Sequence, residues 1–273
     1  ACASGCGAVV RMDYASDAGD FYRAPFPSDT RLLPDGHVSL AGFPEGPGTD
    51  LVHRILTMLG DEATGFGLSS GIYFKLDAPL DPATLPDLHG SVAEGASVFL
   101  IGVSKGAPDY LKRYPIAVSF QAEAGTFGSA NLLSLLPLQG VPLRPKSRYA
   151  AVVLRSVKGK DGRALQQARA VGEMIGGTRP AGMSDAAWAT YGEALSALNE
   201  AKVEGSSIAG LTAFTTWDPV EGFGKVTGAM LAAPLPTLKT PFARKEVFDD
   251  FCVYEGSIPM PVYQQGSPPY TDL

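Results

Sequence analysis

The chain has 273 residues, of which 45% are apolar and 18% charged, a balance that supports a buried core and excludes wholesale disorder. Its formal net charge is −6 and its basic residues form no cluster, which argues against nucleic acid as a partner. The 32 glycines and 22 prolines predict many turns and few long helices. The composition as a whole indicates a turn-rich extracytoplasmic protein.

The N-terminal residues are small, uncharged and rich in cysteine. Cys2 and Cys6 each follow small residues, as does the cysteine that receives lipid in a lipoprotein precursor, so both are candidate lipid-attachment sites. Residues 1–19 are expected to form a flexible tether. The third cysteine, Cys252, makes Cys6–Cys252 a candidate disulfide in an oxidising compartment. A frayed N-terminus with unpaired thiols is the alternative.

Predicted elements begin after an irregular, proline-rich segment over residues 8–48. Asp50 is a candidate N-cap for a helix whose apolar residues share one stripe. Alternating or short, wholly apolar runs then predict five strands, at residues 72–76, 98–103, 116–120, 131–136 and 149–157.

A helical insert is expected at about residues 164–205. Its second helix has Ser184 as the N-cap and one apolar face that is typical of packing, formed by Trp188, Tyr191, Leu195 and Leu198. Another strand follows at Ile208–Thr216. The strands between turn clusters predict a mainly β fold with helical insertions, an immunoglobulin-like β-sandwich over residues 20–233.

The C-terminal part is expected to form a linker and the start of a second unit, residues 234–273. A helix is predicted from Asp218-Pro219 to about Leu231, and the prolines after it indicate a stiff linker. Phe251–Pro259 is predicted to be extended. With no later strand to pair with it, the chain is expected to be truncated.

Gly67-Leu68-Ser69-Ser70-Gly71 matches the G-x-S-x-G pattern of serine hydrolases. A nucleophile elbow needs a strand before the serine and a helix after it, whereas here a helix and a glycine-rich loop precede Ser69 and a strand follows it. Only His89 lies downstream as a base. Ser69 is therefore a weak catalytic candidate and is interpreted as a chance match.

Other candidate sites are weaker still. Asp77, Asp81 and Asp87 lie in one segment and are potential calcium ligands, but the spacing of a calcium loop is missing and Asp81-Pro82 favours a turn. The histidines, His37, His53 and His89, lie at no metal-ligand spacing, and no nucleotide-binding loop is found. No cofactor and no metal site is predicted. Tyr149, at the start of a strand, is predicted to bond its hydroxyl to upstream backbone.

Four short passages within residues 20–230 carry a family resemblance. They are Ala24–Asp29, Phe74–Asp81 with Leu85-Pro86, Leu143–Tyr149 with Val152–Leu154 and Asp161-Gly162, and Ala213–Thr216. Together they resemble the N-terminal, immunoglobulin-like domain of bacterial extracytoplasmic lipases and esterases of the virulence-factor type. The last two are similar to motifs of bacterial immunoglobulin-like modules.

The resemblance implies a function for the chain. A C-terminal α/β-hydrolase domain, with its serine nucleophile, follows this module in the family, and the present chain ends before it. The expected role is a non-catalytic module that positions or covers the hydrolase domain or assists substrate engagement. The expected location is extracytoplasmic in a Gram-negative bacterium, as an outer-membrane lipoprotein, a periplasmic protein or a secreted one. A self-contained esterase that uses Ser69, or a surface adhesin, are the alternatives.

Overall fold

The computed structural model of the protein describes residues 7–15, 20–46, 48, 50–260 and 266–267. The chain divides into two compact units, Ala1–Pro219 (unit 1) and Val220–Leu273 (unit 2). Over the described residues it forms nine strands, all in antiparallel sheets, and few helices. The fold is therefore mainly β, as the sequence predicts. No helix within these ranges is long and apolar enough to span a bilayer.

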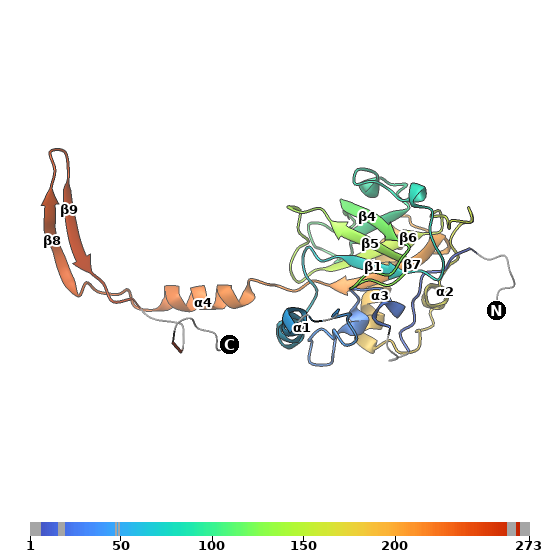
Figure 1. The fold of residues 1–273 in the computed structure, drawn as a ribbon, viewed down its shortest axis with the longest axis horizontal. Coiled ribbons are helices and arrows are strands. Elements are labelled where there is room, and N and C mark those ends of the chain that lie inside the picture. The colour runs from blue at the N-terminus through green and yellow to red at the C-terminus, as the bar shows by residue number, and fades with distance from the viewer. Residues whose placement is uncertain (1–6, 16–19, 47, 49, 261–265, 268–273) are drawn as a thin grey trace. The chain divides into compact units, whose positions relative to one another are not determined.

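Unit 1 contains two antiparallel sheets (Figure 1). One has three strands in the order β1-β5-β4, and the other has four in the order β3-β2-β6-β7. The strands are β1 Ile72–Lys75, β2 Val98–Gly102, β3 Arg113–Tyr114, β4 Ile116–Gln121, β5 Leu132–Pro137, β6 Arg148–Leu154 and β7 Ile208–Thr215. All five strands expected before the helical insert are present within a few residues of their predicted bounds.

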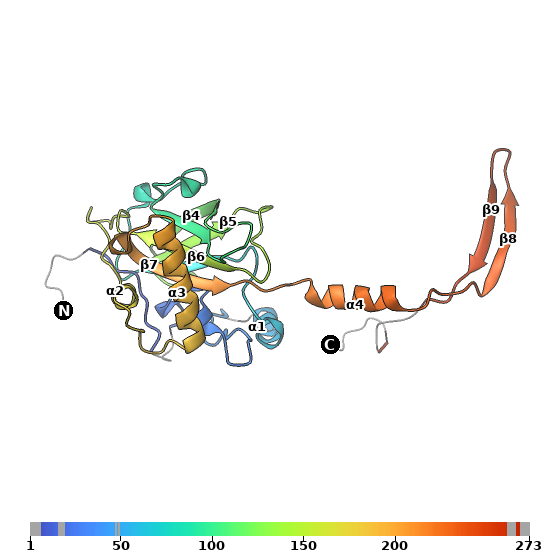
Figure 2. The same cartoon turned by 180° about the vertical axis from the view of Figure 1, so that it is seen from behind.

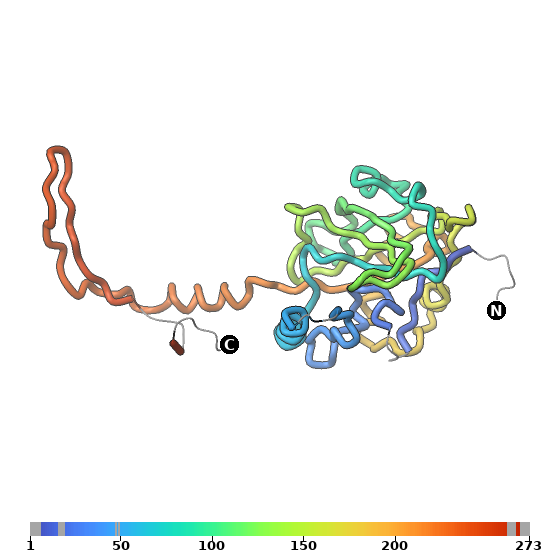
Figure 3. The backbone as a smooth tube through the Cα atoms, viewed as in Figure 1, coloured from blue at the N-terminus to red at the C-terminus, as the bar shows by residue number. Residues whose placement is uncertain are grey.

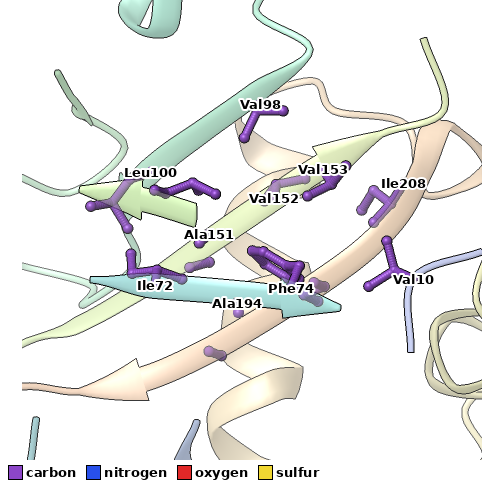
Figure 4. Packing of buried hydrophobic residues seen from close by; sticks show 14 of the residues in the cluster. Val10, Ile72, Phe74, Val98, Leu100, Ala151, Val152, Val153, Ala194 and Ile208 are labelled. Carbon is purple, nitrogen blue, oxygen red and sulfur yellow. The ribbon is translucent and has the colours of Figure 1, made fainter. Parts of the chain in front are cut away.

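The two sheets contribute to one hydrophobic core (Figure 4). Phe74 of β1, Leu100 of β2 and Val152 of β6 are fully buried within it. In β4 buried or half-buried residues alternate with exposed ones, because one face of this strand meets water. In contrast, every residue of β2 is buried. The four-stranded sheet is therefore covered on both faces, which explains why the sequence of β2 is apolar throughout.

Two helices form the second cover of the four-stranded sheet. α2 (Arg169–Ile175) contacts β7, and α3 (Asp185–Glu200) contacts β6 and β7. In Figure 2 α3 lies in front of these strands, whereas the three-stranded sheet lies in front in Figure 1. α3 begins as predicted, because the Ser184 side chain accepts a hydrogen bond from the Ala187 amide.

The N-terminal segment of unit 1 runs along β1. Val10 and Phe26 form antiparallel bridges to Leu76 and Tyr73, respectively. Figure 3 traces this segment in blue. Its short 3₁₀ helices are η1 (Phe21–Arg23) and η2 (Asp29–Arg31), and those later in the unit are η3 (Pro82–Thr84), η4 (Gly90–Val92) and η5 (Gly205–Ser207). The helix α1 (Asp50–Glu62) follows the segment.

Unit 2 consists of one helix and one hairpin. α4 spans Glu221–Ala232, and β8 (Thr240–Val247) pairs with β9 (Cys252–Ser257) in an antiparallel register. Phe248 and Phe251 stack at the turn, with ring centroids 4.6 Å apart. None of its described residues is buried. These described residues form no hydrophobic core.

Three details differ from the sequence predictions. α2 starts at Arg169 rather than at about residue 164, where the helical insert is expected to begin, because the amides of Leu165 and Gln166 donate to the carbonyls of Val157 and Ala8. The extended segment at β9 does have a strand partner, β8, which precedes it and contains part of the expected linker. The observed division lies at 219/220, whereas the predicted one lies at 233/234, so that α4 groups with the hairpin.

Candidate functional site

An apolar cavity of about 660 Å³ in unit 1 is the strongest candidate site. One side is formed by α1, through Val52, Leu56 and Leu59. The remaining walls come from distant parts of the chain and are mostly apolar, formed by Phe26, Val38, Leu40, Phe43, Phe66, Leu68, Pro142, Trp217 and others. Phe26 and Phe66 meet edge to face, with ring centroids 5.6 Å apart, which joins this wall to the core.

Ser69 lines the cavity beside Ser70. It lies in a turn after α1 and before β1, which is the element order expected from the sequence and the reverse of a nucleophile elbow. A Cβ at Gly67 would meet the Ser70 hydroxyl, so a side chain there would require Ser70 to adopt another rotamer. Whether Ser69 has a catalytic role stays a prediction.

The histidines lie away from Ser69. All three fall within the described residues, and none contributes to the cavity wall. His53 sits on α1 with a side chain that is 63% exposed and contacts Glu45, Nδ1 to Oε2 at 3.1 Å. His37 contacts Asp35, and His89 precedes η4. No base is therefore placed next to the Ser69 hydroxyl within the described residues.

The three aspartates of the proposed calcium segment each accept a hydrogen bond from a backbone amide. Asp77 accepts from Val9 at 2.7 Å, Asp81 from Ala83 at 3.1 Å, and Asp87 from Gly90 at 2.6 Å. Asp81 thereby caps η3, as the turn interpretation predicts. Among the described residues no cluster of histidine, cysteine or carboxylate side chains is arranged to hold a metal ion.

Tyr149 links two parts of unit 1. Its hydroxyl accepts a hydrogen bond from the Arg144 amide at 2.8 Å, as predicted, and donates one to Asp109 Oδ2 at 2.6 Å. Tyr114 donates to the same Asp109 oxygen at 2.7 Å. Burial, with the Asp109 hydrogen bond second, raises the pKa of Tyr149. This phenol stays protonated and holds the corner that leads into β6.

Asp29 is a buried carboxylate whose role the sequence analysis missed. Its side chain accepts hydrogen bonds from the Thr215 amide and hydroxyl, both at 2.7 Å, and from the Thr190 hydroxyl at 2.9 Å. Burial raises its pKa, against the lowering effect of these hydrogen bonds and of Arg148. Asp29 thus ties the N-terminal segment to β7 and α3. The Ala24–Asp29 passage was the only sequence signal.

A hydroxyl network lies next to Asp29. The Ser28 and Tyr191 hydroxyls are 2.8 Å apart, and the Thr212 hydroxyl donates to the Pro27 carbonyl at 2.5 Å. In the same way Thr216 donates to the Arg144 carbonyl at 2.6 Å. Two of the passages that carry the resemblance, Ala24–Asp29 and Leu143–Tyr149, are therefore each hydrogen-bonded to a third, Ala213–Thr216.

Of the three cysteines, the structure describes Cys252. Cys2 and Cys6, the candidate lipid-attachment sites, lie outside the described residues. Cys252 is exposed at the start of β9. Its pairing with Cys6 stays a prediction.

A scan against protein-family models found no match to this chain, and a search of curated proteins found no significant relative. The resemblance to lipase N-terminal domains therefore stays a prediction.

Proposed function

We propose that this chain is the non-catalytic, immunoglobulin-like N-terminal module of an extracytoplasmic bacterial lipase or esterase. It positions or covers a C-terminal α/β-hydrolase domain of the same parent chain. The proposal rests on the sequence resemblance, and the single structural observation that carries it is the apolar surface of unit 2.

The helix and the hairpin of unit 2 expose apolar side chains that another surface could bury. An isolated two-stranded hairpin is marginally stable in water. Here α4 and the hairpin leave large apolar side chains exposed, among them Phe223, Leu231, Phe242, Phe251 and Tyr254. Exposed apolar groups in such density mark an interaction site. A hydrolase domain that packs on them is the occupant that the resemblance implies.

The strand order of unit 1 supports the immunoglobulin-like part of the proposal. If β1 to β7 correspond in order to strands B, C, C′, D, E, F and G, the sheets become B-E-D and C′-C-F-G. This is the division of strands between sheets in that fold, apart from the first strand. The N-terminal segment, which bridges to β1, takes the place of that strand. Tyr149 then lies near the start of strand F, where a tyrosine corner belongs.

Activity of the isolated chain is the first test. We expect the purified 273 residues to show no turnover of short-chain nitrophenyl esters and no labelling by a fluorophosphonate probe. Labelling at Ser69, abolished in Ser69→Ala, would overturn the proposal in favour of a self-contained esterase.

The coding sequence after Leu273 is the second test. A G-x-S-x-G between a strand and a helix supports the proposal, whereas a stop codon or further immunoglobulin-like repeats favour an adhesin.

The apolar surface is tested in the parent protein with its hydrolase domain. Phe242→Asp in β8 is expected to lower the thermal stability of the hydrolase domain or its ester turnover. Leu33→Asp, at an exposed apolar side chain of unit 1, is the matched control and is expected to leave both unchanged. Equal effects of the two variants would contradict a role for unit 2 in holding that domain.

A further inference from the structure

The helix α1 covers a hollow rather than a packed core. An amphipathic helix of a globular protein ordinarily buries its apolar stripe. None of the residues of α1 is buried, although Val52, Leu56 and Leu59 point their apolar side chains into the cavity wall. Leu51 and Met58 on the same helix are exposed as well. A ligand in the cavity would supply the apolar contacts that this stripe lacks.

The walls determine which ligand fits. None of the described residues that line the cavity is charged, so a charged group inside would lose its hydration without a partner among them. The volume of about 660 Å³ lies within the range of roughly 300–1,000 Å³ that is typical of small-molecule sites. Among the described residues, the hydroxyl side chains of the wall are those of Ser69 and Ser70, which are neighbours in one turn. The cavity thus offers a mostly apolar surface with its hydroxyl side chains, as far as the described residues show, at one place.

We infer that this cavity is a binding site for the hydrocarbon chain of a lipid, with α1 as its cover and the polar end of the ligand at the Ser69–Ser70 turn or in water. Each methylene of the chain that leaves water for such a site adds to the affinity, because its transfer from water is favourable. The site lies wholly within unit 1 and requires no hydrolase domain. It is therefore independent of the proposed function.

Fluorescence titration of the full chain with cis-parinaric acid tests the inference. We expect a saturable increase at one probe per chain, reversed by palmitate. Leu56→Glu places a carboxylate in the wall and is expected to weaken binding at least about tenfold. Val52→Trp fills part of the cavity without a charge and is expected to weaken binding too. Circular dichroism confirms that each variant is folded.

Thr57→Glu is the matched control, because Thr57 is exposed on α1 and lies outside the cavity wall. It carries the same charge change as Leu56→Glu and is expected to bind the probe as the unchanged chain does. Absence of saturable binding, or unchanged binding by both Leu56→Glu and Val52→Trp, would overturn the inference.

Two further measurements distinguish a lipid in the cavity from a probe bound to unit 2 and from a second copy of the chain. If Phe223→Ser in α4 abolishes the signal, the probe sits on the apolar surface of unit 2 and the inference fails. If analytical ultracentrifugation shows a dimer that Leu56→Glu dissociates, a second copy covers the cavity and the inference fails as well. Binding by a monomeric chain that Leu56→Glu weakens and Phe223→Ser leaves unchanged supports the lipid site.

Discussion

Units 1 and 2 differ in the burial of their apolar side chains. In unit 1 the aromatic and aliphatic residues of two sheets and two helices fill one core, and Phe74 is 0% exposed. In unit 2 β8 and β9 pair with each other, with two register irregularities, and Phe242 of β8 is 65% exposed. Strand pairing alone therefore does not make a core, because burial requires a second layer. The apolar side chains of unit 1 therefore make their stabilising contacts within the unit, whereas the exposed apolar side chains of unit 2 do not.

The largest expected effect separates the two units directly. Phe74→Ala removes a fully buried ring between the sheets and is expected to lower the free energy of unfolding by about 3–5 kcal/mol. Phe242→Ala removes an equally large ring that is exposed, so its effect is expected to stay within about 0.5 kcal/mol. Urea unfolding measures both, followed by tryptophan fluorescence for unit 1, which contains Trp188 and Trp217, and by circular dichroism for the whole chain. Similar losses in the two variants would show that unit 2 has a buried core.

The second prediction concerns the buried carboxylate of unit 1. Asp29→Ala leaves the Thr215 amide and two hydroxyls without their acceptor and is expected to cost about 2–3 kcal/mol at neutral pH. Urea unfolding of the variant gives this value. A loss below about 0.5 kcal/mol would mean that Asp29 does not tie the N-terminal segment to β7.

The pH dependence of stability sharpens this second test. The pKa of Asp29 is raised by burial, so the folded chain holds its proton more tightly than the unfolded chain does. The contribution of this group to stability is expected to fall as pH rises from the ordinary value of 3.8 through the raised pKa, and to be constant above it. Asp29→Asn, which cannot ionise, is expected to remove that part of the pH dependence.

A smaller effect is expected at the corner before β6. Tyr149→Phe keeps the buried ring but removes two hydrogen bonds, to the Arg144 amide and to Asp109, and is expected to cost about 1–2 kcal/mol. Tyr254→Phe in unit 2, where the side chain is exposed, is the matched control with no expected change. A stability of Tyr149→Phe equal to that of the control would exclude a stabilising corner.

Local periodicity predicted much of the fold. Apart from β3, the strands of unit 1 follow from alternation and apolar runs, and the helix after Ser184 follows from capping. All of these are properties of neighbouring residues. β8 was missed because Pro241 was interpreted as part of a linker. The strand tolerates a proline at its second residue because β8 is an edge strand of a two-stranded sheet. The two-residue strand β3 is too short for any period to appear.

The candidate site was harder to predict than the fold. Phe26, Leu56 and Trp217 come together only through the tertiary arrangement, and no spacing in the sequence relates them. The apolar stripe on α1 could be recognised in the sequence. Whether it packs on the core or lines a cavity depends on residues from distant parts of the chain. Asp29 likewise was visible within a motif, while its partner Thr215 lies far along the chain.

The smallest expected effect is that of removing unit 2 altogether. A chain that ends at Pro219 retains the core and the Asp29 and Tyr149 hydrogen bonds, all of which join residues of unit 1. We expect its free energy of unfolding to match that of the full chain within about 0.5 kcal/mol, and its solubility to rise because exposed apolar groups are lost. Urea unfolding and static light scattering of the two chains measure these quantities. A large loss of stability on truncation would mean that unit 2 shields part of unit 1, and the contrast between a self-sufficient unit and a dependent one would then fail.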